Sequence, residues 1–117
     1  MAVTRAEIAN RALRRCGKLA FGQTATSDLS DEALQAYDEV YSYLEELGIV
    51  DWGATASVPN EYAFWVIAMT AYSLADTLGI PNERYQRIGI DANNAESEIR
   101  RIRTNYFTPN EIRISDF

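Results

Sequence analysis

The chain has 117 residues, of which 47% are hydrophobic and 24% are charged, and its formal net charge is −6. This balance is typical of one soluble globular domain that can bury a core without help from disulfides or metals. The sequence contains no histidine and a single cysteine, Cys16, which excludes an intrachain disulfide and every Cys/His zinc pattern. We expect no signal peptide and no membrane partner, because the longest strongly apolar stretch, Tyr62–Ala75, is shorter than the roughly 20 residues of a spanning helix.

Charge is distributed unevenly along the chain. Residues 1–18 hold five of the eleven cations and one acid, whereas residues 19–83 hold eleven acids and no Lys or Arg. A chain this acidic is a poor sequence-independent DNA binder, because phosphate affinity comes from clustered cations. Surfaces of opposite sign on one small protein suit head-to-tail association between copies.

The first predicted helix begins with a capping box, Thr4-Arg-Ala-Glu7, in which hydroxyl and carboxylate each accept from the other's backbone N–H, and ends at Gly17. Its apolar face comprises Ile8, Ala9, Ala12, Leu13 and Cys16. Its cations lie in an arc of about 100° on the opposite side: Arg11, Arg14, Arg15 and Lys18. This basic face is interpreted as a solvated surface, a contact with a protein partner, or a contact with DNA.

A second helix is predicted from about Ser30 to Gly48. Its apolar face comprises Leu34, Tyr37, Val40, Tyr41, Leu44 and Leu47, and a separate acidic face comprises Asp31, Glu32, Asp38, Glu39, Glu45 and Glu46. The acidic pairs Asp38/Glu39 and Glu45/Glu46 indicate either a solvated face or a subunit interface.

The next segment, residues 49–58 with Trp52, is predicted to be an ordered loop. Pro59 is placed in the first turn of a third helix that is apolar nearly all round until Gly79, which predicts a central helix. A fourth helix opens with Pro81, and Gly89 is expected to weaken its first turns. Its core seam is predicted to be Tyr85, Ile88, Ala92, Ala95, Ile99, Ile102 and Tyr106. The expected fold is therefore all-α, a four-helix bundle body over residues 1–106.

In the segment 107–117, the apolar residues Ile112 and Ile114 alternate with polar neighbours, and the segment ends on Phe117. Disordered tails are poor in Ile and Phe, so this pattern favours an arm that orders on a partner, by adding a strand, over a simply disordered terminus. Fully extended, the arm could reach about 35 Å. Its predicted contact residues are Phe107, Ile112, Arg113, Ile114 and Phe117.

The sequence offers little for catalysis. Cys16 has no histidine to activate it and lies on an apolar face, and no phosphate loop or metal-ligand spacing occurs. Glu61 and Asp76 form the best carboxylate pair for glycoside hydrolysis, but one helix would hold them about 22 Å apart. A helix-turn-helix is disfavoured by the long connection between the first two helices and by the acids of the second. We predict no enzyme, no cofactor and no metal.

Three stretches carry a family likeness. They are Glu7–Gly17 (E-I-A-N-R-A-L-R-R-C-G), Ser30–Gly48 with S-D-E-A-L and Y-L-E-E-L-G, and Val58–Gly79 with V-P-N-E-Y and L-A-D-T-L-G. In these positions, and over residues 4 to about 104, the chain resembles head-to-tail adaptor proteins of tailed phages. It resembles especially the tail accessory or head-completion factors of short-tailed phages.

The resemblance implies a virion protein, made in the host cytoplasm, that forms a ring of twelve subunits beneath the dodecameric portal. Such a ring extends the DNA channel and receives tail or nozzle proteins, and an acidic lining would let DNA pass without specific binding. Residues 107–117 would correspond to the portal-binding arm. A subunit interface is predicted between the cations Arg11, Arg14, Arg15 and Lys18 and the acids Asp38, Glu39, Glu45 and Glu46. The alternatives are a cell-wall (peptidoglycan) lytic enzyme that uses carboxylates and a small DNA-binding regulator.

Overall fold

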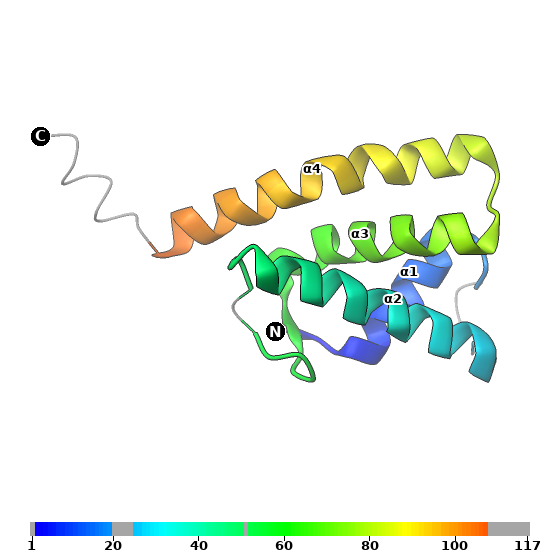
Figure 1. The fold of residues 1–117 in the computed structure, drawn as a ribbon, viewed down its shortest axis with the longest axis horizontal. Coiled ribbons are helices and arrows are strands. Elements are labelled where there is room, and N and C mark those ends of the chain that lie inside the picture. Colours follow the sequence, from blue (N-terminus) through cyan, green and yellow to red (C-terminus); the bar gives the residue numbers. More distant parts are fainter. Residues whose placement is uncertain (1, 20–24, 51, 108–117) are drawn as a thin grey trace, which may run out of the picture.

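The computed structural model describes residues 2–19, 25–50 and 52–107. Within them the chain forms α1 (Arg5–Arg15), α2 (Ser27–Glu46), α3 (Asn60–Leu78) and α4 (Asn82–Phe107). Two short strands, β1 (Ala2–Val3) and β2 (Val58–Pro59), pair antiparallel with Val3 opposite Val58. The prediction of an all-α fold with four helices is confirmed (Figure 1). The small β pair was not predicted from the sequence.

Helix α3 is the centre of the bundle. It packs against α1, α2 and α4, and α4 packs mainly on α3. Figure 1 shows α4 on one side of α3 and the pair α1 and α2 on the other. The prediction of a central third helix is confirmed, because its buried residues come from all round the helix: Tyr62, Ala63, Val66, Ile67, Ala68, Thr70, Ala71, Leu74 and Ala75.

The core is divided into two clusters along α3. One lies beside the β pair and includes Ile8, Tyr37, Leu44, Val58 and Ile99. The other lies at the C-terminal end of α1 and includes Leu13, Cys16, Leu74 and Ile88. Burying apolar side chains of this size contributes about 1.5–3 kcal/mol each, so both clusters help to hold α4 on the bundle.

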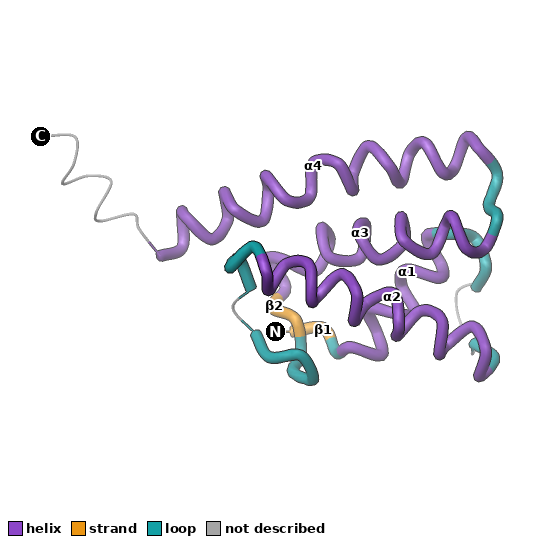
Figure 2. The backbone as a smooth tube through the Cα atoms, in the orientation of Figure 1, coloured by secondary structure: helices purple, strands orange, loops and turns teal. Residues whose placement is uncertain are grey.

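Trp52 fixes the connection between α2 and β2. Its Nε1–H donates to the Tyr37 hydroxyl at 3.0 Å, and the Tyr41 hydroxyl donates to its carbonyl at 2.9 Å. The indole ring lies 5.2 Å from the ring of Tyr62. These contacts confirm an ordered loop, which Figure 2 shows leading directly into the β pair.

Glycines end three of the helices, as predicted. Gly17, Gly48 and Gly79 have φ of +77°, +72° and +63°, the left-handed region that favours glycine. After α1, the N–H of Gly17 donates to Arg14 O at 2.9 Å and the N–H of Lys18 donates to Leu13 O at 3.0 Å. These bonds satisfy carbonyls that the helix end would otherwise leave unpaired.

Several predicted helix starts are wrong by a few residues. Helix α2 begins at Ser27 and not near Ser30, because the Thr26 hydroxyl caps it by accepting from Leu29 N–H at 3.3 Å. Pro59 precedes α3 as its cap residue and belongs to β2, since its extended backbone pairs with β1.

The expectation that Gly89 would delay the regular part of α4 is also wrong. The helix begins at Asn82 and runs through Gly89 to Phe107. Gly89 is buried against α3, and a Cβ at this position would lie 3.1 Å from Tyr72 Cε1. Close packing between the two helices therefore accounts for this glycine. Three of the predicted seam residues, Ile88, Ala95 and Ile99, are fully buried.

Candidate functional site

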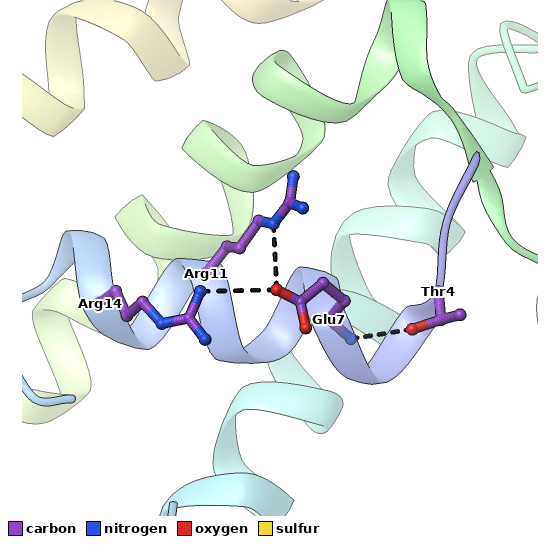
Figure 3. Close-up of polar contacts among 4 residues, drawn as sticks. All are labelled: Thr4, Glu7, Arg11 and Arg14. Atoms are coloured by element: carbon purple, nitrogen blue, oxygen red, sulfur yellow. Dashed lines mark hydrogen bonds and ion pairs between the residues drawn. The ribbon is translucent and has the colours of Figure 1, made fainter. Parts of the chain in front are cut away.

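The first turn of α1 begins a network of charged residues. The N–H of Glu7 donates to the Thr4 hydroxyl at 3.2 Å, which is the hydroxyl half of the predicted capping box. The Glu7 carboxylate accepts from Arg11 Nε at 3.1 Å and from Arg14 Nη1 at 3.4 Å. Figure 3 shows both guanidinium groups converging on this carboxylate. Two of the four predicted interface cations thus have a partner inside the chain.

Arg15 turns toward α4 instead of toward solvent. It forms an ion pair with Asp91, and its guanidinium carbon lies 5.3 Å from the centre of the Phe64 ring. Its side chain is 24% exposed, and burial lowers its pKa from the ordinary value. Arg15 therefore ties α1 to both α3 and α4, while Lys18 is exposed just beyond the end of α1.

An open cleft of about 570 Å³ lies between the end of α1 and the start of α4. Arg84 Nη1 donates to the carbonyl of Arg15 at 3.0 Å, and its guanidinium lies against Gly17. Arg87 is mostly exposed, with Glu83 4.0 Å away. The cleft is lined by Arg15, Pro81, Glu83, Arg84, Arg87 and Ile88.

Arg84 and Arg87 were not predicted from the sequence as residues of a functional surface. The available signal was that they are the first cations to follow Lys18 in the chain. Their juxtaposition with α1 depends on the packing of α4, which no local pattern contains.

The acidic face of α2 is only partly occupied within the chain. Asp38 accepts from Arg5 through both carboxylate oxygens, at 3.1 and 2.6 Å, and this hydrogen-bonded pair raises the pKa of Arg5. Glu39, Glu45 and Glu46 are exposed. No salt bridge among the described residues involves any of these three glutamates.

A groove of about 230 Å³ runs between α2 and α4, with α3 at its base. Its apolar lining is Val40, Tyr43, Met69, Tyr72 and Ala92, and Glu39 lies beside them. The Tyr43 hydroxyl donates to Glu96 Oε1 at 2.7 Å, and this bond raises the pKa of Tyr43. The groove is therefore apolar inside and acidic at its edge.

The residues considered for catalysis are not brought together. Glu61 and Asp76 are both exposed and lie at opposite ends of α3, about 22 Å apart along its axis. Cys16 is buried, its Sγ contacts Ala71 O at 3.3 Å, and burial raises its pKa to about 11. The described part of the chain contains no group of three or more residues that could hold a metal ion. None of its helices combines the length and apolarity needed to cross a membrane.

The predicted arm falls largely outside the described residues. Phe107 is the last residue of α4, whereas Ile112, Arg113, Ile114 and Phe117 lie in the segment that the structure does not describe. The division between body and arm at residue 107 therefore stays a prediction.

Comparisons with protein-family models, curated proteins and solved structures found no significant match to this chain. The resemblance to phage adaptors stays a prediction from the sequence.

Proposed function

We propose that this protein is a structural subunit of the head-to-tail junction of a tailed phage. In this proposal, copies of the chain form a ring beneath the portal. The resemblance to phage adaptors implies that the ring has twelve subunits. The ring extends the DNA channel and carries the tail or nozzle proteins. The observation that supports it most is the separation of charge between the outer faces. Cations gather at the end of α1 and the start of α4, while Glu39, Glu45 and Glu46 of α2 point outward without a salt bridge among the described residues.

The acidic face also suits a wall beside which DNA must move. An acidic surface repels a polyanion, so DNA would pass without being held. A recognition role for α2 conflicts with the same charges, which makes sequence-specific DNA binding the weaker proposal.

The portal contact is assigned to residues 107–117. Helix α4 is the longest helix, and Figure 1 shows its C-terminal end running past the start of α3, away from the rest of the bundle. A portal contact made by the residues that follow α4 would therefore lie at the edge of the body. The apolar residues Ile112, Ile114 and Phe117 would provide the anchors.

Truncation tests this assignment. A chain without residues 107–117 should keep its helical circular dichroism spectrum but lose binding to the portal protein of the same virus in a pull-down. Negative-stain microscopy of the full chain mixed with portal should show added density beneath the portal ring. Unchanged portal binding by the truncated chain would contradict the arm, and an absence of binding by the full chain would contradict the proposed function.

A further inference from the structure

Two different surfaces flank α4, one on the side of α1 and one on the side of α2. Asp91 of α4 pairs with Arg15 of α1, and Glu96 of α4 accepts from Tyr43 of α2. Five residues along a helix correspond to a rotation of about 140°, so these two contacts leave opposite sides of α4. The two surfaces therefore face away from each other.

The surface on the α1 side combines cations with an exposed aromatic ring, and we name it the basic flank (Phe64, Lys18, Arg84 and Arg87). Phe64 is 51% exposed, although a large apolar side chain gains from burial. Arg84 lies against Gly17, the residue before Lys18, and Arg84 and Arg87 line the cleft. Arg15, which lines the same cleft, lies over the Phe64 ring and so joins the aromatic ring to the cations. The basic flank thus offers an apolar knob beside positive charge.

The surface on the α2 side has the opposite character, and we name it the acidic flank. Its carboxylates lie within about 40° of one another around α2 and extend over about 27 Å of its length. They are the exposed residues Asp28, Glu32, Glu39 and Glu46. The apolar groove between α2 and α4 opens beside Glu39. The acidic flank thus offers an apolar hollow beside negative charge.

We propose that the basic flank of one copy docks on the acidic flank of the next, with Phe64 entering the groove between α2 and α4. Lys18, Arg84 and Arg87 then face Glu39 and Glu46 of the neighbour. This inference rests on the proposed function, since it provides the contact between subunits of the ring. Because the two flanks differ, the contact is head-to-tail, and repeating it closes a ring when the rotation between copies permits.

A second copy fits the basic flank better than a nucleic acid does. Asp91 pairs with Arg15 and Glu83 lies 4.0 Å from Arg87, so two of the three arginines of the cleft have a carboxylate beside them within the chain. Nucleic acid binding depends on uncompensated cations, whereas a protein interface needs paired charges around an apolar centre. Arg11 and Arg14 share Glu7 within the chain, which shifts the expected contact from the middle of α1 toward Lys18 and α4.

Lys18 allows a direct test because it is the only lysine in the chain. A carbodiimide joins its ε-amine to a carboxylate in contact with it, forming an amide and transferring the elements of water to the reagent. A mixture of isotope-labelled and unlabelled protein should give a covalent dimer in which mass spectrometry finds Lys18 joined to Glu39 or Glu46 of the other copy. A dimer joined only through other carboxylates, or no dimer at high protein concentration, would overturn the proposal.

Charge reversal gives a second test by light scattering. Arg87→Glu and Glu39→Arg should each weaken association at least about fivefold, because each places like charges opposite one another. An equimolar mixture of the two variants should associate again, since each retains the flank that the other lacks. Arg101→Glu, the same charge change at an exposed position elsewhere on α4, is the matched control and should associate like the wild type. Wild-type association by Arg87→Glu would overturn the proposal, as would failure of the mixture to recover.

Portal binding, measured in parallel, separates this contact from the proposed function. If the truncated chain loses portal binding while Lys18 forms no crosslink to α2, the flank contact is wrong and the adaptor function stands. If the crosslinks form as expected but the full chain does not bind portal, the contact stands and the adaptor function is wrong. A third outcome concerns nucleic acid. If the wild-type protein shifts the mobility of short duplex DNA and Arg84→Ala does not, the cleft binds nucleic acid and the proposal is overturned.

Discussion

Arg15 and Asp91, 76 residues apart in the sequence, form an ion pair that joins the end of α1 to the first half of α4. Arg15 also lies over the Phe64 ring of α3, so one side chain contacts three helices. Helix α4 otherwise packs mainly on α3. The pair therefore helps to set how α4 lies on the bundle and, with it, the shape of the cleft beside Arg84.

Asp91→Asn should lower the free energy of unfolding by about 1–2 kcal/mol, because it leaves a partly buried guanidinium without its counter-charge. A double-mutant cycle by urea denaturation, with Asp91→Asn, Arg15→Gln and the double variant, should give a coupling energy of at least about 0.5 kcal/mol. Glu83→Gln is the control, because the Glu83–Arg87 pair is 4.0 Å long and exposed, and its loss should change stability by less than about 0.5 kcal/mol. Additive effects of the two changes at Arg15 and Asp91 would contradict the coupling.

Gly17 is constrained both by its backbone and by Arg84, whereas Gly48 is constrained by its backbone alone. Both have positive φ, so alanine at either position should cost about 1 kcal/mol. A Cβ at Gly17 would lie 3.2 Å from Arg84 Cζ, while one at Gly48 would have no described atom within 4 Å. We therefore expect Gly17→Ala to cost more than Gly48→Ala in thermal unfolding. The excess should disappear in an Arg84→Ala background, and its persistence there would contradict the packing argument.

Features of the fold that depend only on residues close together in the sequence were predictable. The Thr4 cap and the left-handed glycines at positions 17, 48 and 79 act within a few residues of themselves. The apolar surface of α3 on all sides also followed from its own composition. The β pair was not predictable, because it joins residues 2–3 to residues 58–59, which are far apart in the sequence.

In the candidate site, too, contacts within one helix were predictable from the sequence and contacts between helices were not. The pairing of Glu7 with Arg11 spans one helical turn, a spacing that sequence alone displays. The partners of Arg15 and Asp38 lie on other helices, so a helical wheel presents these side chains as free surface charges. The cleft with Arg84 and Arg87 forms only where the end of one helix meets the start of another.

The contact between Gly89 and Tyr72 predicts an unusual response to alanine. In a helix interior, Gly→Ala normally stabilises by about 1 kcal/mol. Here the added Cβ would lie 3.1 Å from a Tyr72 ring that is stacked on Tyr85 with ring centres 5.1 Å apart, so the ring cannot move aside without losing that contact. Gly89→Ala should therefore fail to stabilise the wild type in urea denaturation. In a Tyr72→Ala background it should stabilise by about 1 kcal/mol, and equal effects in the two backgrounds would contradict the close approach.

Cys16 makes the stability depend on pH in the alkaline range. Burial raises the pKa of its thiol from 9.0 to about 11, so the unfolded chain loses this proton at a lower pH than the folded chain does. The stabilisation is complete below pH 9 and falls as the pH rises toward 11, by about 2 kcal/mol in total. Cys16→Ala lacks the titrating group and should lose less stability over this interval, although removal of the sulfur costs about 1 kcal/mol at neutral pH. Burial also raises the pKa of Tyr37. Because both chains contain Tyr37, its contribution to the pH dependence of the unfolding free energy cancels when the two chains are compared. Urea denaturation at intervals from pH 7 to 11 measures that difference, and parallel curves for the two chains would show that the Cys16 thiol is not held in its protonated form by the fold.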